Sequence, residues 1–148
     1  KVQRVSEEKA SMNIVVDANI LFSALLKHGV TAEILLRTDV ALFAPEFIFE
    51  EFNIYKEELL SKTSRTDDDF FTFLTILKRR ISILPYDDIL PFLETAKSIS
   101  PDEKDTVYLA LALRLQCAMW SNDKALKEKQ DVIKVFHTHE LLSLLDVA

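Results

Sequence analysis

Short runs of apolar, mostly β-branched residues alternate along this chain with longer stretches in which apolar residues recur every three or four positions. Runs of the first kind predict buried strands, and stretches of the second kind predict helices that cover them. The predicted strands are residues 13–16, 40–44, 81–84, 118–121 and 132–136. Because strands that alternate with helices form parallel sheets covered on both faces, the pattern predicts an α/β fold.

The stretch 100–123 carries the strongest signals. Ser100, Pro101 and Glu103 predict a helix start, with an N-cap, a proline at the first helical position and a capping box. The helix that follows is apolar nearly all round, so we expect it to be buried. Asp105 lies about one turn past the cap and is not explained by capping. A carboxylate at the mouth of a buried helix is costly unless a positive group meets it.

Two further acids follow predicted strands. Asp17 comes directly after residues 13–16, and Asp123 comes just after residues 118–121. In open parallel sheets, ligands bind beyond the carboxyl ends of the strands. Asp17, Asp105 and Asp123 are far apart in sequence but can converge at that edge, which favours a metal site over three unrelated surface acids.

Composition narrows the class of protein. With 148 residues, 49% hydrophobic and 28% charged, the chain is expected to form one globular domain. Residues 1–11 are polar and aperiodic, so we expect a disordered extension before a single domain over residues 12–148. No apolar run approaches the roughly 20 residues that span a bilayer. We therefore expect no membrane contact.

Charge and cysteine content bear on compartment and partners. A net charge of −6 argues against broad binding of nucleic acid through phosphates, but it is compatible with an enzyme that meets phosphate through a bound metal. The single cysteine, Cys117, excludes an internal disulfide and fits a reducing cytoplasm.

Several other polar residues have simpler explanations. His28 fits helix-end electrostatics, and His137 and His139 lack a third ligand nearby, so we expect them to be exposed. The basic trio at residues 78–80 fits a helix C-terminus, although it could also meet RNA phosphates. Adjacent acids at 50 and 51 are about 100° apart on a helix, so at most one faces a site.

With the acids placed, the chain resembles a PIN domain from Met12 to Leu145. No single motif is specific, but four in the right order at plausible separations make a strong combination. The resemblance implies a three-layer α/β/α sandwich on a mostly parallel sheet. The motifs are residues 14–21, residues 44–45 with 50–52, residues 105–112 and residues 120–123.

The resemblance also implies a metal-dependent endonuclease that acts on single-stranded RNA, with four acids around one or two Mg²⁺ or Mn²⁺ ions. Glu51 is preferred to Glu50 as the second acid because the family acid usually precedes an apolar residue, here Phe52. Many small members are VapC-type toxins, so an antitoxin protein is an implied partner. The four acids map to Asp17, Glu51, Asp105 and Asp123.

The roles within that implied site differ. We expect Asp17, Asp105 and Asp123 to form the metal site, with Asp17 and Asp123 as direct ligands. Asp105 and Glu51 then position metal-bound water. Asn19 and Ser121 fall where the family places polar residues that steady the acids or this water.

Other readings remain open. A magnesium-dependent phosphohydrolase would need a second aspartate at position 19, where this chain has Asn19. A receiver domain would need an aspartate at the end of the third strand, which instead ends in Leu84. A catalytically silent PIN-like interaction module of an RNA-processing complex is the stronger alternative.

Five phenylalanines exceed what one face of each middle helix can bury, which predicts a homodimer. They are Phe47, Phe49, Phe70, Phe71 and Phe73.

Overall fold

The structure, a computed structural model, describes residues 12–100 and 102–147. The predicted extension at residues 1–11 and the predicted helix-start proline, Pro101, lie outside the described residues. Five parallel strands form one sheet in the order β3-β2-β1-β4-β5. The strands are β1 (Met12–Val16), β2 (Val40–Pro45), β3 (Ile81–Leu84), β4 (Ala118–Trp120) and β5 (Val135–Phe136).

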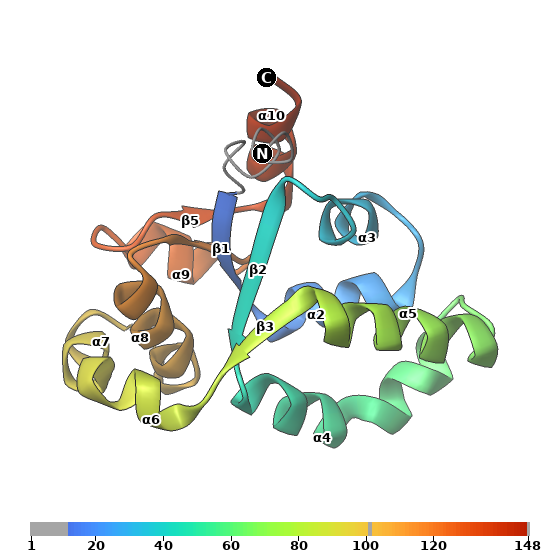
Figure 1. Cartoon of the computed structure of the whole chain (residues 1–148), viewed down its shortest axis with the longest axis horizontal. Coiled ribbons are helices and arrows are strands. Elements are labelled where there is room, and N and C mark those ends of the chain that lie inside the picture. Colours follow the sequence, from blue (N-terminus) through green and yellow to red (C-terminus); the bar gives the residue numbers. More distant parts are fainter. Residues whose placement is uncertain (1–11, 101, 148) are drawn as a thin grey trace, which may run out of the picture.

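Helices cover both sides of this sheet, which confirms the predicted three-layer α/β/α sandwich (Figure 1). One side carries α2 (Ala18–Leu26), α3 (Val30–Leu35), α4 (Phe47–Lys62) and α5 (Asp67–Arg80). The other carries α6 (Tyr86–Ile89), a 3₁₀ turn (Leu90–Phe92), α7 (Leu93–Ile99) and α8 (Thr106–Leu115). The short α9 (Lys124–Lys129) and α10 (Thr138–Val147) pack beside β5.

Strand β1 lies at the centre and determines where a ligand can bind. Ile14, Val15 and Val16 are all fully buried, as expected for a strand covered on both faces. The chain runs outward from β1 to β2 and β3, then returns to place β4 on the other side of β1. The order of the strands therefore reverses between β1 and β4, and such a switch point opens a crevice at the carboxyl ends of the two strands.

The predicted helix start at Ser100 is wrong. Ser100 is the C-cap of α7, and Asp102 caps a separate 3₁₀ turn, Glu103–Asp105, by accepting the Lys104 N–H at 3.0 Å. Asp102 has extended backbone angles. Helix α8 begins only at Thr106, and Asp105 lies at its mouth.

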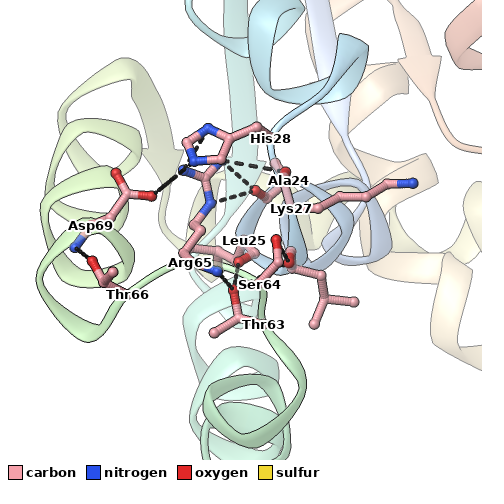
Figure 2. Close-up of polar contacts among 10 residues, drawn as sticks. Ala24, Leu25, Lys27, His28, Thr63, Ser64, Arg65, Thr66 and Asp69 are labelled. Carbon is pink, nitrogen blue, oxygen red and sulfur yellow. Dashed lines mark hydrogen bonds and ion pairs between the residues drawn. The ribbon is translucent and has the colours of Figure 1, made fainter.

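The carboxyl end of α2 is held by the segment that follows α4 (Figure 2). The last four carbonyls of a helix have no partner within it. Here the Thr63 hydroxyl donates to Leu25 O at 2.6 Å and the Ser64 N–H donates to Leu26 O at 2.8 Å. The Arg65 guanidinium donates to Ala24 O at 2.9 and 3.2 Å, so three consecutive residues satisfy this helix end.

Arg65 is the centre of that arrangement (Figure 2). It is only 7% exposed, lies 4.2 Å from the ring centre of Phe73 and pairs with Asp69 at 2.8 Å. His28 covers the pair from outside, with Nε2 3.2 Å from the Asp69 carboxylate. The positive charge also complements the negative end of the α2 dipole. His28 is thus accounted for by structure, as expected.

The basic trio also has structural roles. Arg80 donates to Leu35 O at 2.8 Å and to Val40 O at 3.3 Å, and it also bonds Arg37 O. Lys78 lies over the ring of Phe49. Arg80 therefore ties α5 to the carboxyl end of α3 and to β2, whereas the side chains of Lys78 and Arg79 are exposed.

Replacing Arg65 by methionine keeps the length of the side chain but removes its donors. Buried carbonyls at the end of α2 and the charge of Asp69 then lose their partner. We expect the free energy of unfolding to fall by about 3 kcal/mol, measured by urea denaturation.

Arg79→Met is the matched control, because the side chain of Arg79 is exposed on α5. This substitution should change the free energy of unfolding by no more than about 0.5 kcal/mol. Equal effects of the two substitutions would show that Arg65 does not hold the end of α2.

Candidate active site

A cavity of about 160 Å³ lies at the carboxyl edge of the sheet. All four acids expected from the sequence line it, although they come from four separate segments: the end of β1, the second turn of α4, the mouth of α8 and the residues after β4. Asn19 lines the same cavity. We call it the acid cavity; its acids are Asp17, Glu51, Asp105 and Asp123, and Asp102 also reaches its wall.

Asp17 joins β1 to α2. It is the N-cap of α2, and its carboxylate accepts the Asn19 N–H at 3.3 Å and the Ser121 hydroxyl at 2.7 Å. Its own N–H donates to Trp120 O at 3.1 Å, which continues the pairing of β1 with β4. The side chain is 8% exposed, and this burial raises its pKa in spite of the hydrogen bonds that lower it.

Ser121 connects two of the acids. Its hydroxyl is fully buried, donates to Asp17 and accepts the Asp123 N–H at 3.1 Å. Asp123 in turn caps α9 by accepting the Leu126 N–H at 3.1 Å. A single hydroxyl therefore fixes the ends of β1 and β4 relative to each other.

The two neighbouring glutamates face different cavities. Glu51 lines the acid cavity and accepts a hydrogen bond from the Tyr108 hydroxyl, whereas Glu50 lines a separate cavity. Burial raises the pKa of Glu51, and the negative charge of Asp17 adds to the shift. The geometry thus places Glu51, rather than Glu50, beside the other acids.

Tyr108 was missed by the sequence reasoning. It is buried on α8, and its pKa is raised by burial and by the hydrogen bond to Glu51, so the hydroxyl remains a donor. A signal existed, because Tyr108 follows Asp105 by three positions and therefore lies on the same stripe of the helix. The partner, 57 residues away on α4, could not be read from the sequence.

Asp105 lies among several other carboxylates, whose negative charges act on it. Its pKa is raised to about 7, first by burial and then by the negative charges of four carboxylates: Asp17, Asp123, Asp102 and Glu51. Among the described residues that line the cavity, Lys104 is the one cation, and it lowers the pKa of Glu51. The cavity therefore has an excess of negative charge that a cation would relieve.

The donor chemistry fits a hard divalent cation, since the acids offer oxygen atoms only. Within residues 12–100 and 102–147, however, no three acids, histidines or cysteines are already arranged as ligands of one ion. Asp17, Asp105 and Asp123 could hold Mg²⁺ or Mn²⁺ only after side-chain rotation.

The histidines take no part in this cavity. His139 is exposed as expected, but His137 is partly buried, so the expectation of exposure is wrong for that residue. Its Nε2 finds no hydrogen-bond partner within the part of the chain that the structure describes. The two rings lie in edge contact, 5.9 Å apart between centres.

The comparisons with known proteins agree with this architecture. A family model described as PIN domain matches residues 15–139. The chain belongs to the PIN domain family. Members of this family are generally nucleases, so the acid cavity lies in a nuclease fold. No curated protein sequence matches the chain significantly.

Solved structures share the fold at low sequence identity. VapBC2 from Rickettsia felis, crystallised bound to a DNA fragment from their promoter, superposes with a TM-score of 0.63 at 15% identity, over 85% of this chain and 98% of that one. PAE2754 from Pyrobaculum aerophilum gives a TM-score of 0.61 at 17% identity, over 93% and 91%. These likenesses confirm the PIN fold.

The raised pKa of Asp105 gives a pH dependence. A carboxyl group whose folded pKa is raised stabilises the fold below its unfolded pKa, near 3.8, and that stability is lost as pH rises through the folded value of about 7. In EDTA, the melting temperature should therefore fall between about pH 4 and pH 7 and level off above that range. Asp105→Asn should flatten this fall.

Asp131→Asn, which alters an exposed acid outside the cavity, is the control and should keep the wild-type slope. Calorimetry across this range checks the result. An unchanged slope in Asp105→Asn would mean that this carboxyl group does not carry the shift.

Proposed function

We propose that this PIN domain is a metal-dependent endoribonuclease that hydrolyses phosphodiester bonds in single-stranded RNA. The supporting observation is that Asp17, Glu51, Asp105 and Asp123 line one cavity at the switch point of the sheet. With a net charge of −6, the chain is poorly suited to hold RNA by surface charge alone. A cation in the acid cavity would attract the phosphate.

Asp17, Asp105 and Asp123 are the residues that would hold Mg²⁺ or Mn²⁺. Such an ion supplies charge stabilisation at a scissile phosphate and a lowered pKa for bound water. Asp105 lines the cavity beside Asp17 and Asp123, where its carboxylate could position the attacking water. The Tyr108 hydroxyl holds Glu51 so that its free carboxylate oxygen can orient this water.

A second cavity supports a protein partner. It is about 360 Å³, lies between α2 and α4, and shares Asn19, Glu51 and Lys104 with the acid cavity. A segment bound there would cover the active site. Because VapBC2 is a structural neighbour, we propose that an antitoxin occupies it. A small antitoxin gene directly upstream would support the toxin role over RNA processing.

Two further points concern the cellular location of the protein and the alternative to a ribonuclease. No helix in the described part of the chain combines the length and apolar character that crossing a membrane requires. We propose that the protein acts in the cytoplasm, in line with its single, free Cys117. The alternative, a catalytically silent interaction module, predicts no RNA cleavage under any metal condition.

We also propose a homodimer, on altered grounds. Phe70 and Phe73 are buried within the chain, so they do not demand a partner. Apolar side chains do remain exposed on α4 and α5, notably Ile54 at 73% and Phe71 at 41%. These faces are available for a two-fold interface.

Light scattering tests this assembly. At tens of micromolar the wild type should have the mass of a dimer, and Ile54→Lys, which places a charge on the exposed apolar face, should have the mass of a monomer. A monomeric wild type at this concentration contradicts the proposal.

The site itself is tested by one substitution with opposite effects on activity and stability. Asp17→Asn keeps an N-cap residue but removes a buried negative charge. It should abolish RNA cleavage, raise the melting temperature in EDTA and shrink the stabilisation that millimolar Mg²⁺ or Mn²⁺ gives the wild type. A mixed panel of single-stranded RNAs, with and without EDTA, gives the activity.

Glu57→Gln is the control, since this glutamate is exposed on α4 and lines neither cavity. It should match the wild type in both assays. An Asp17→Asn protein that melts clearly below the wild type in EDTA would make Asp17 a structural residue and would contradict the metal site.

A further inference from the structure

Beyond the acid cavity, a separate cavity of about 350 Å³ lies at the end of β2, between α4, α6 and α8. We propose that it binds one base of the RNA, next to the phosphate that is cleaved; this inference rests on the proposed ribonuclease function. We call it the side cavity. Its lining residues are Pro45, Glu46, Phe47, Glu50, Tyr86, Ile89 and Val107.

The side cavity and the acid cavity use neighbouring residues of the same two helices. On α4, Glu50 lines the side cavity and Glu51 lines the acid cavity. On α8, Val107 lines the side cavity and Tyr108 lines the acid cavity. Consecutive Cα atoms are about 3.8 Å apart. The two cavities therefore have walls from the same two helices, and we place the phosphate at the acids and the base in the side cavity.

The walls suit an unstacked base. They are mostly apolar and include two aromatic rings, Phe47, which is partly buried, and Tyr86, which is 46% exposed. Proteins that recognise single-stranded RNA stack splayed bases on such rings and read their edges by hydrogen bonds. The volume lies within the range of small-ligand sites.

The polar groups at this cavity select among bases. Glu46 accepts the backbone N–H of Tyr86 at 3.2 Å, which holds its carboxylate in place. Glu50 is exposed, and no side chain among residues 12–100 and 102–147 pairs with it. Ionised carboxylates are acceptors only, so they match bases that present N–H donors. Guanine offers two adjacent donors and fits best, whereas uracil has a single N–H.

An apolar side chain of a protein partner fits less well. It would bring no donor to Glu46 and Glu50 while reducing their hydration. The same carboxylates repel a phosphate, which keeps the RNA backbone at the acid cavity.

The test is cleavage of a randomised single-stranded RNA pool in Mg²⁺, with sequencing of the product ends. Wild type should show an enriched guanine at one fixed position from the cut. Glu50→Gln should weaken this preference, and Glu57→Gln should retain it. On a fixed substrate, Tyr86→Ala should raise KM roughly 5- to 100-fold with kcat unchanged, and Tyr86→Phe should restore it.

The outcomes separate this inference from the proposed function. Cleavage with the same base preference in wild type, Glu50→Gln and Tyr86→Ala overturns the side cavity and leaves the ribonuclease intact. If wild type cleaves no RNA, the proposed function fails. Fluorescence anisotropy, which measures RNA binding, then tests the side cavity by itself. Asp17→Asn protein should then bind an oligouridylate carrying one guanine more tightly than plain oligouridylate, and Tyr86→Ala should remove the difference.

Equal binding of the two oligonucleotides overturns the base site, as does a Tyr86 effect confined to the binding of a protein partner. Should Tyr86→Ala fail to fold, Glu50→Gln, which changes an exposed side chain, carries both assays.

Discussion

The hydroxyl of Ser121 is the contact on which the active-site geometry depends. It donates to Asp17 and accepts the N–H of Asp123, and so it joins the ends of β1 and β4 where the strand order reverses. Backbone pairing alone brings these strands side by side, but it does not orient the carboxylates. Because Ser121 is fully buried, the hydroxyl has no water to compete for its hydrogen bonds.

A second constraint holds α2 at both ends. Asp17 caps its amino end, and Thr63, Ser64 and Arg65 satisfy its last carbonyls. The latter residues directly follow α4, the helix that carries Glu51. The contacts that satisfy the end of α2 thus also set how α2 and α4 lie relative to each other, and with them two walls of the acid cavity. The accumulated negative charge makes this cavity costly without a cation.

The sequence predicted the elements whose signals are local. Buried strands ending in Asp17 and before Asp123 were evident from apolar runs, and the family resemblance supplied the sandwich and Glu51. The helix start before Asp105 was wrong because Ser100, which resembles an N-cap, ends one helix while Asp102 caps the next turn. Local capping patterns do not reveal which of two adjacent elements they serve.

Long-range partners could not be predicted. The hydrogen bond that holds Glu51 comes from Tyr108, which lies on a different helix, 57 positions away. Arg65 lies in a polar stretch of the sequence, yet it is buried against the carbonyl of Ala24, 41 positions away. Backbone carbonyls are present at every residue, so no pattern of side chains marks them as partners of one arginine.

The central claim is that the acid cavity binds a divalent metal ion. Crystals soaked in Mn²⁺, examined by anomalous diffraction, test it most directly. We predict an anomalous peak within coordination distance of Asp17 and Asp123, with Asp105 at the same ion directly or through water. A peak elsewhere, or none in crystals of a protein that cleaves RNA under the same conditions, would contradict it.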